Sequence, residues 1–112
     1  MYLLIGDDND PCCQIVQTLL HKEGHTVYAL AEPLAGDTPF YWEFDTTRSK
    51  SSLRLPNGRV ITDRAWQGVL VRGTGEPMDQ KGWEPADLAY IQAETRAALI
   101  AWLQNLPCPV IL

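Results

Sequence analysis

The first 31 residues hold a strand, a helix and a second strand, and this order restricts the possible folds more than any other feature. Residues 2–6 form a short apolar run ending at a turn signal, typical of a strand buried on both faces. Asp10 precedes Pro11 as a helix N-cap would, and Gly24 stands where the helix should end. Residues 26–31 are a second apolar strand. The pattern predicts a right-handed strand–helix–strand unit and therefore a parallel sheet.

The middle of the chain changes to an alternating pattern. Apolar and polar residues alternate over residues 40–45, a polar stretch follows at 46–52, and Asn57-Gly58 lies between two short apolar runs. Alternation with a period of two indicates strands, and Asn-Gly is a strong signal for a tight hairpin turn. We therefore predict antiparallel strands with a hairpin, and residues 46–52 as a polar connection.

The last part of the chain returns to the patterns of a parallel sheet. Residues 69–71 predict a third buried strand that ends in a glycine-rich turn, and "CPVIL" at 108–112 predicts a fourth. Between them a mainly apolar set of side chains recurs at helical spacing, namely Leu88, Ile91, Thr95, Leu99, Trp102 and Leu106. This spacing predicts a long amphipathic helix, with Leu99 and Trp102 as anchors of the core.

Together these elements predict one α/β domain with a mostly parallel sheet, two main helices and an inserted antiparallel hairpin. The parallel strands are expected in the order second, first, third, fourth, with the hairpin region inserted before the third. Two helices are few for a sheet that needs both faces covered. Phe40, Trp42 and Phe44 then predict an apolar surface and a homodimer through it. The alternative is a monomer in which the hairpin folds back over these aromatics.

Composition excludes several classes of function. The net charge is −5, and the nine Lys and Arg residues form no basic run, so we expect no nucleic acid as a partner. No apolar run approaches the roughly 20 residues that cross a bilayer, and the N-terminus lacks a signal sequence, so we expect a cytoplasmic protein with no membrane contact. The three cysteines, two of them adjacent, fit neither a disulfide framework nor metal-ligand spacing.

An acidic loop, "GDDNDP", follows the first strand. It resembles the start of a response-regulator receiver domain, whose acidic residues bind magnesium beside a phosphoacceptor aspartate. Here the third parallel strand ends at Arg72 and Gly73, which cannot be phosphorylated. The loop also lacks the G-x-G-x-x-G spacing of a dinucleotide site and places negative charge where a phosphate would bind. We therefore expect no metal, with Asp10 as the N-cap and Asp7 and Asp8 favourable near the helix start.

The candidate site lies at the carboxyl ends of the parallel strands, where open α/β sheets usually bind ligands. The "RGTG" turn there is expected beside the acidic loop, which makes the candidate substrate-binding residues Asp7, Asp8, Arg72, Gly73 and Thr74. The Arg72 guanidinium could hold a substrate carboxylate in a bidentate fork. The alternative is an ion pair from Arg72 to Asp7 or Asp8. No Ser-His-Asp or Cys-His set is recognisable, so we expect no catalytic residue in this chain.

A second resemblance extends over nearly the whole chain. The order of "YLLIGDDNDP", "FYWEFD", "LRLPNGRVI", "QGVLVRGTGEP" and "DLAYIQAETRAALIAWLQNLPCPVIL" resembles a pre-ATP-grasp domain, the small N-terminal domain that precedes an ATP-grasp module. The resemblance implies a Rossmann-like sheet over residues 1–112 as a single domain of a longer protein. In such proteins the strand corresponding to "CPVIL" passes into the ATP-grasp body.

The resemblance also implies a function. ATP-grasp enzymes activate a carboxylate as an acyl phosphate and join it to an amine or thiol, with ATP and magnesium bound in the later domains. We therefore expect this chain to hold no cofactor, to have no catalytic activity alone, and to have the ATP-grasp domain of its parent chain as partner. Its role would be that of a scaffold and one wall of the substrate cleft of a carboxylate-amine ligase-like protein. The alternative is a non-phosphorylated receiver-like signalling or interaction module.

Overall fold

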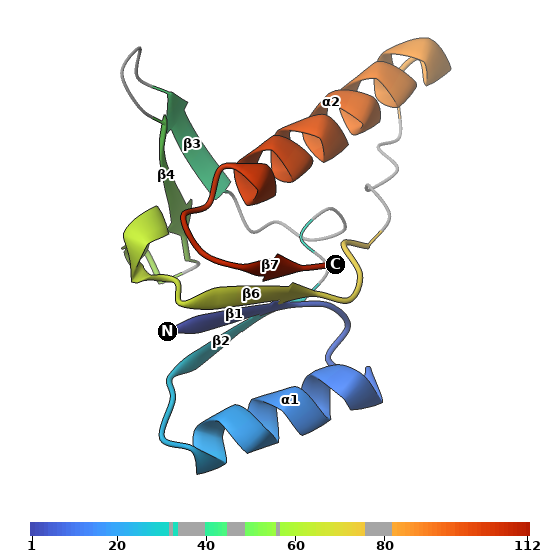
Figure 1. Ribbon diagram of the computed structural model, residues 1–112. Coiled ribbons are helices and arrows are strands. Elements are labelled where there is room, and N and C mark those ends of the chain that lie inside the picture. The colour runs from blue at the N-terminus through green and yellow to red at the C-terminus, as the bar shows by residue number, and fades with distance from the viewer. Residues whose placement is uncertain (32, 34–39, 45–48, 56, 76–81) are drawn as a thin grey trace.

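We analysed the protein as a computed structural model, which describes residues 1–31, 33, 40–44, 49–55, 57–75 and 82–112. For residues 40–44 and 49 only the backbone is described. The described residues form a parallel sheet with a helix on each face, and a smaller antiparallel sheet beside it (Figure 1). This is the predicted α/β class.

The parallel sheet has four strands in the order β2 (Val27–Leu30), β1 (Tyr2–Ile5), β6 (Gly68–Val71) and β7 (Val110–Ile111). β1 pairs in parallel with β2 on one side and with β6 on the other, so that Leu4 lies opposite both Ala29 and Leu70. β7 adds in parallel to the far edge of β6. The predicted order of second, first, third and fourth strand is confirmed.

Helix α1 (Pro11–Lys22) covers the face of the sheet below β1 and β2 in Figure 1. Its start is determined by Asp10, whose backbone is extended and whose carboxylate accepts a hydrogen bond from the Cys12 N–H. Pro11 needs no hydrogen-bond partner at this first helical position. After the helix Gly24 adopts a φ of 84°, the left-handed conformation that glycine tolerates best. The predicted helix and both of its ends are confirmed.

Helix α2 (Pro85–Gln104) lies on the opposite face of the sheet. Its last turns are buried through Leu99, Trp102 and Leu103, whereas Tyr90 and Ile91 nearer its start are 67% and 39% exposed. The predicted helix and its two anchors are confirmed, but the expected burial of its apolar face holds only for the C-terminal half. The reason is geometric: the N-terminal half of α2 projects past the edge of the sheet (Figure 1), so the sheet cannot cover it.

The antiparallel sheet contains β3 (Phe40–Phe44), β4 (Ser49–Arg54) and β5 (Val60–Thr62), followed by a short 3-10 helix at Asp63–Ala65. The predicted hairpin turn at Asn57-Gly58 joins β4 to β5, and Gly58 has a φ of 84°. The prediction of a polar connection over 46–52 was wrong for its second half, because residues 49–52 are the first part of β4. The pairing of these residues with β3 uses backbone groups, so it does not require apolar side chains.

The side chains of Phe40, Trp42 and Phe44 lie outside the described residues, so the homodimer expected through them stays a prediction. Among the residues that the structure describes, no helix is long and apolar enough to cross a membrane.

The core lies between the parallel sheet, the C-terminal half of α2 and the antiparallel sheet. Leu3 and Ile5 of β1 are fully buried and belong to one cluster with Leu99 and Trp102 of α2. The cluster continues into the antiparallel sheet through Leu53 and Ile61. Because side chains alternate along a strand, Leu4, which lies between Leu3 and Ile5 in β1, points to the α1 side.

We predict that Leu99→Ala lowers the free energy of unfolding by about 2 to 5 kcal/mol, because it removes a side chain that is only 1% exposed. Ile100→Ala is the matched control: Ile100 is 48% exposed, so its loss should stay below about 1 kcal/mol. Urea unfolding of the three proteins measures both values. A loss below about 0.5 kcal/mol for Leu99→Ala would contradict the assignment of this residue to the core.

Candidate functional site

The carboxyl edge of the parallel sheet carries two loops, one after β1 and one after β6. Strand alternation continues into the second loop and divides it between the two faces. Arg72 follows the alternation of Leu70 and points to the α1 side, whereas Val71 and Gly73 belong to the α2 side. The candidate site therefore has two separate parts.

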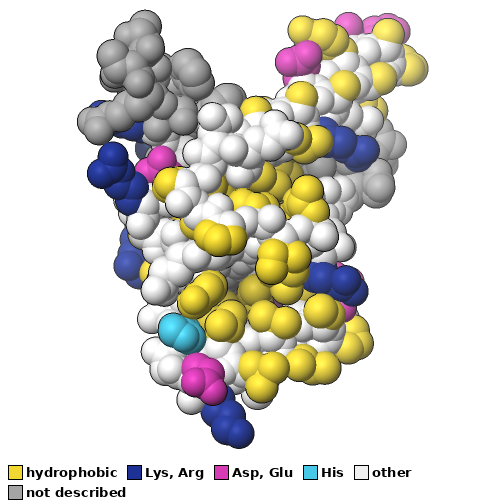
Figure 2. Space-filling model, viewed as in Figure 1, with side chains coloured by type: hydrophobic (Ala, Val, Ile, Leu, Met, Phe, Trp, Pro, Cys, Tyr) yellow, Lys and Arg dark blue, Asp and Glu magenta, His cyan; other side chains and the backbone are white. Residues whose placement is uncertain are grey.

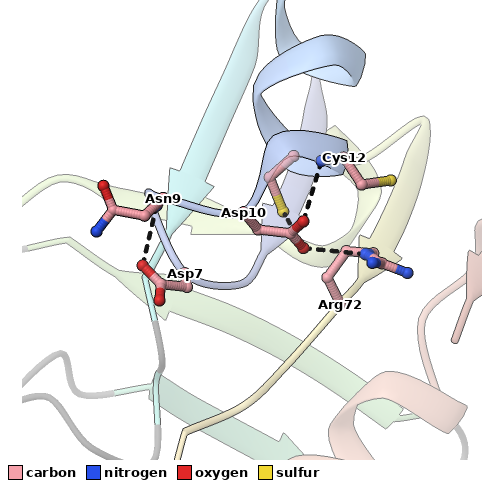
Figure 3. Close-up of polar contacts among 6 residues, drawn as sticks. Asp7, Asn9, Asp10, Cys12 and Arg72 are labelled. Atoms are coloured by element: carbon pink, nitrogen blue, oxygen red, sulfur yellow. Dashed lines mark hydrogen bonds and ion pairs between the residues drawn. The ribbon is translucent and has the colours of Figure 1, made fainter.

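On the α1 side, Arg72 and Asp10 form an ion pair with 3.0 Å between Nε and Oδ2 (Figure 3). The other carboxylate oxygen of Asp10 accepts the hydrogen bond from the Cys12 N–H at 3.0 Å. The buried Cys13 thiol donates to Asp10 Oδ2 at 3.6 Å. One carboxylate thus joins the end of β6 to the first turn of α1.

The predicted ion pair therefore exists, but its partner was wrong: it is Asp10 and not Asp7 or Asp8. Asp7 Oδ1 accepts a hydrogen bond from the Asn9 N–H at 2.9 Å, so this carboxylate is bonded within its own loop. Asp7 and Asp8 are exposed. Asp10 is the N-cap, so it lies where the loop meets the helix, beside the end of β6. This position brings its carboxylate within reach of Arg72.

The ion pair changes the proton affinity of its members. The hydrogen bond from Arg72, and then that from the Cys12 N–H, lower the pKa of Asp10 below its usual value of 3.8. The same contact with Asp10 raises the pKa of Arg72. Burial, followed by the charge of Asp10, raises the pKa of the Cys13 thiol. Cys13 is therefore a neutral hydrogen-bond donor and is poorly suited to act as a nucleophile.

Gly6 brings these groups together because it has no side chain. A Cβ at this position would lie 2.9 Å from Cys13 Sγ and 3.1 Å from the Cβ of Arg72. The end of β1 therefore approaches both α1 and β6 more closely than any other residue type would allow. From the sequence Gly6 is recognisable only as a turn signal, and its packing role becomes visible in the structure.

On the α2 side, a pocket of about 640 Å³ opens beside the carboxyl end of β6. The turn residues Gly73, Thr74 and Gly75 line it together with Arg96 of α2. The apolar remainder of the lining is made of Val71, Leu99, Ile100, Leu103 and Leu112. A hydroxyl, a guanidinium and turn backbone above an apolar floor suit a ligand with both apolar and anionic parts.

The structure thus brings together two of the predicted site residues, Gly73 and Thr74, and separates them from Arg72. Arg96 and Gly75 were not among the predicted residues. Arg96 could have been found, because it precedes the core anchor Leu99 by three positions and so lies on the neighbouring helical turn of the same side. Among the described residues, no group of three or more His, Cys, Asp or Glu side chains could hold a metal ion.

Comparison with known proteins identifies the fold. No protein-family model and no curated protein matches the sequence. Among solved structures, the chain is similar to macrocyclase MdnB from Microcystis aeruginosa MRC, with a TM-score of 0.79, 19% identity, and coverage of 97% of this chain and 36% of that one. It is also similar to a RiPP-associated ATP-grasp ligase from Chryseobacterium gregarium, solved with ADP and a leader and core peptide. That match has a TM-score of 0.73 and 13% identity, and covers 97% of this chain and 34% of the ligase.

A third similar structure is macrocyclase MdnC from Microcystis aeruginosa MRC, bound with precursor peptide MdnA. Its TM-score is 0.73 at 11% identity, with 96% of this chain and 36% of that chain covered. This chain thus spans about a third of the length of the solved structures that it matches. The resemblance to a pre-ATP-grasp domain is confirmed at the level of the fold, which is that of one segment of these longer macrocyclases and ligases.

We predict that Gly6→Ala lowers the free energy of unfolding by about 1 to 3 kcal/mol, because the new methyl group must displace Cys13 or the end of β6. Gly73→Ala is the control, since a Cβ there meets no described atom within 4 Å. Adding Cys13→Ala to Gly6→Ala should recover part of the loss. Urea unfolding of the single and double variants tests this coupling, and equal losses for the two glycine variants would contradict it.

A second prediction concerns pH. The lowered pKa of Asp10 means that its contribution to stability is fully present above its usual value of 3.8 and is lost as the pH falls through the lower, folded value. Asp10→Asn keeps a capping oxygen but cannot titrate. The difference in unfolding free energy between wild type and Asp10→Asn should therefore shrink as the pH falls below about 3.8.

Asp8→Asn, which removes one negative charge from the same loop outside the ion pair, is the matched control. Urea unfolding between about pH 2 and pH 6 measures these differences. A constant difference between wild type and Asp10→Asn over this range would show that the ion pair does not form in solution.

Proposed function

We propose that this chain is the N-terminal, non-catalytic domain of an ATP-grasp-type ligase, serving as a scaffold and as one wall of the substrate cleft. The observation that carries the proposal is the α2-side pocket at the carboxyl end of β6, in a fold that matches about a third of each longer ligase or macrocyclase. Ligands of open α/β sheets bind at this edge, so the pocket lies where a substrate wall is expected.

We expect the described residues to hold neither ATP nor magnesium, and among them no group of three or more His, Cys, Asp or Glu side chains could hold a metal ion. Asp7, Asp8 and Asp10 surround the start of α1 with negative charge, where a phosphate would otherwise bind to the helix N-terminus. In the proposed protein, ATP and Mg²⁺ would be held by the ATP-grasp domain. This chain would contribute substrate contacts only.

We propose a peptide with a carboxylate side chain as the substrate. Two of the similar structures contain a bound peptide, and this supports a peptide as the substrate class here. In the pocket, the Arg96 guanidinium can pair with a carboxylate, and the hydroxyl of Thr74 can add a hydrogen bond. The apolar floor formed by Leu99 and its neighbours would contact the rest of the peptide.

The ion pair between Arg72 and Asp10 has a supporting role in this proposal. It fixes the start of the turn that leads to Gly73 and Thr74, and so holds one wall of the pocket in place. Arg72 uses its Nε for Asp10 and so belongs to this corner of the α1 side. A substrate-binding role for the exposed Asp7 and Asp8 stays a proposal at the same edge of the sheet.

The experiment is to extend the reading frame past Leu112, purify the whole protein and assay ATP-dependent ligation of acidic peptides. We predict that Arg96→Ala raises KM for the peptide by about tenfold, corresponding to about 1.4 kcal/mol, with a smaller effect on kcat. A contact that is equal in ground state and transition state changes KM and leaves kcat nearly intact.

Arg64→Ala is the matched control, because Arg64 is an exposed arginine on the 3-10 helix, outside the pocket lining. It should leave KM unchanged. A KM that Arg96→Ala does not change would remove the proposed substrate wall. A reading frame that stops at once, without any ligase activity, would overturn the whole proposal in favour of a receiver-like interaction module.

A further inference from the structure

The α1 side of the parallel sheet has a second concave surface, unrelated to the substrate pocket. A groove of about 570 Å³ runs between α1 and the outer strands β6 and β7. Leu4, Leu70 and Ile111 line it from the sheet, and one row of α1 lines it from the helix, namely Cys12, Val16 and Leu20. Figure 2 shows hydrophobic side chains gathered over this part of the molecule.

The groove is apolar and uncharged. None of its lining residues carries a charge, and the carboxamide oxygen of Gln67 already accepts a hydrogen bond from the N-terminal amine of Met1 at 2.8 Å. Ile111 in the lining is 64% exposed, and beyond the lining Ile15 and Leu19 on α1 are 59% and 55% exposed. A carboxylate or a phosphate meets no charged side chain in this lining, which favours an apolar partner.

The path of the chain indicates where a cover for this groove could come from. Parallel sheets are normally covered on both faces. On the α1 side of this sheet, the helix covers only the half formed by β1 and β2. The crossover from β6 to β7 places α2 on the other face, and a further right-handed crossover in the same direction would lie on that face again. The cover must therefore be a segment that does not belong to the next strand–helix–strand step.

We propose that the groove receives the apolar face of a helix from the ATP-grasp body of the same protein. This inference rests on the proposed function. Cys12, Val16 and Leu20 are four residues apart and form the kind of ridge that packs into the groove of a neighbouring helix. This chain covers only 34% to 36% of the similar structures, so a protein of their length contains enough further chain to supply the helix.

The two concave surfaces then have different partners. The apolar groove on the α1 side attaches the domain to the ligase body. The pocket on the α2 side, which contains Arg96 and Thr74, remains open toward the substrate.

The experiment uses the Cys12 thiol as a reporter of access to the groove, because Cys12 lines it. The labelling rate of Cys12 with N-ethylmaleimide is measured by mass spectrometry in the 112-residue chain and in the whole protein, relative to that of Cys108, which lies outside the groove lining. We expect the relative rate to fall by about tenfold or more in the whole protein, since labelling then requires the docked helix to leave.

Ile111→Asp in the whole protein should restore fast labelling, because it places a charge in the apolar contact. Tyr90→Asp is the matched control: Tyr90 is 67% exposed on α2, so the same change should leave Cys12 protected. The wild-type comparison needs no variant and remains informative if Ile111→Asp fails to fold. Unchanged labelling in a whole protein with ligase activity would overturn the docking inference alone, whereas loss of the proposed function would appear as absence of that activity.

Discussion

Strand β1 is the element on which the rest of the domain depends, because it is buried from every direction. Leu3, Leu4 and Ile5 are at most 3% exposed, and the strand pairs with β2 on one edge and β6 on the other. Alternation sends Leu3 and Ile5 toward α2 and Leu4 toward α1. Each helix can therefore be placed only with reference to this one strand, and so can both loops of the candidate site.

The tight packing at the end of β1 also determines the positions of the two loops that follow β1 and β6. Gly6 allows α1 and the end of β6 to approach the strand together, and Asp10 then connects the two through its bonds to Cys12 and Arg72. The result is an edge with different chemistry on each face. A capped, ion-paired corner and an uncharged groove lie on the α1 side, and a pocket with a guanidinium lies on the α2 side.

Most of the fold could be predicted from the sequence because its signals are local. The run of apolar residues in β1, the Asp10 cap before Pro11 and the Asn57-Gly58 turn each act within a few residues, and the structure confirms all three. The errors came where tertiary contacts override local pattern. Residues 49–52 are polar but become part of β4 through pairing with β3, and Ile91 follows the apolar spacing of α2 but lies beyond the cover of the sheet.

The candidate site shows the same division. The sequence by itself determined that Arg72 and an acidic loop would meet at one edge, because both follow parallel strands that pair with each other. Only the tertiary structure decided that Asp10 is the partner of Arg72, since this choice depends on how closely Gly6 lets α1 approach β6. It also decided that Arg96 lines the same pocket as Gly73 and Thr74, because the position of α2 over the sheet is set by the burial of Trp102 and Leu99. Spacing along a chain specifies which face of an element a residue occupies, and the packing of elements decides what that face meets.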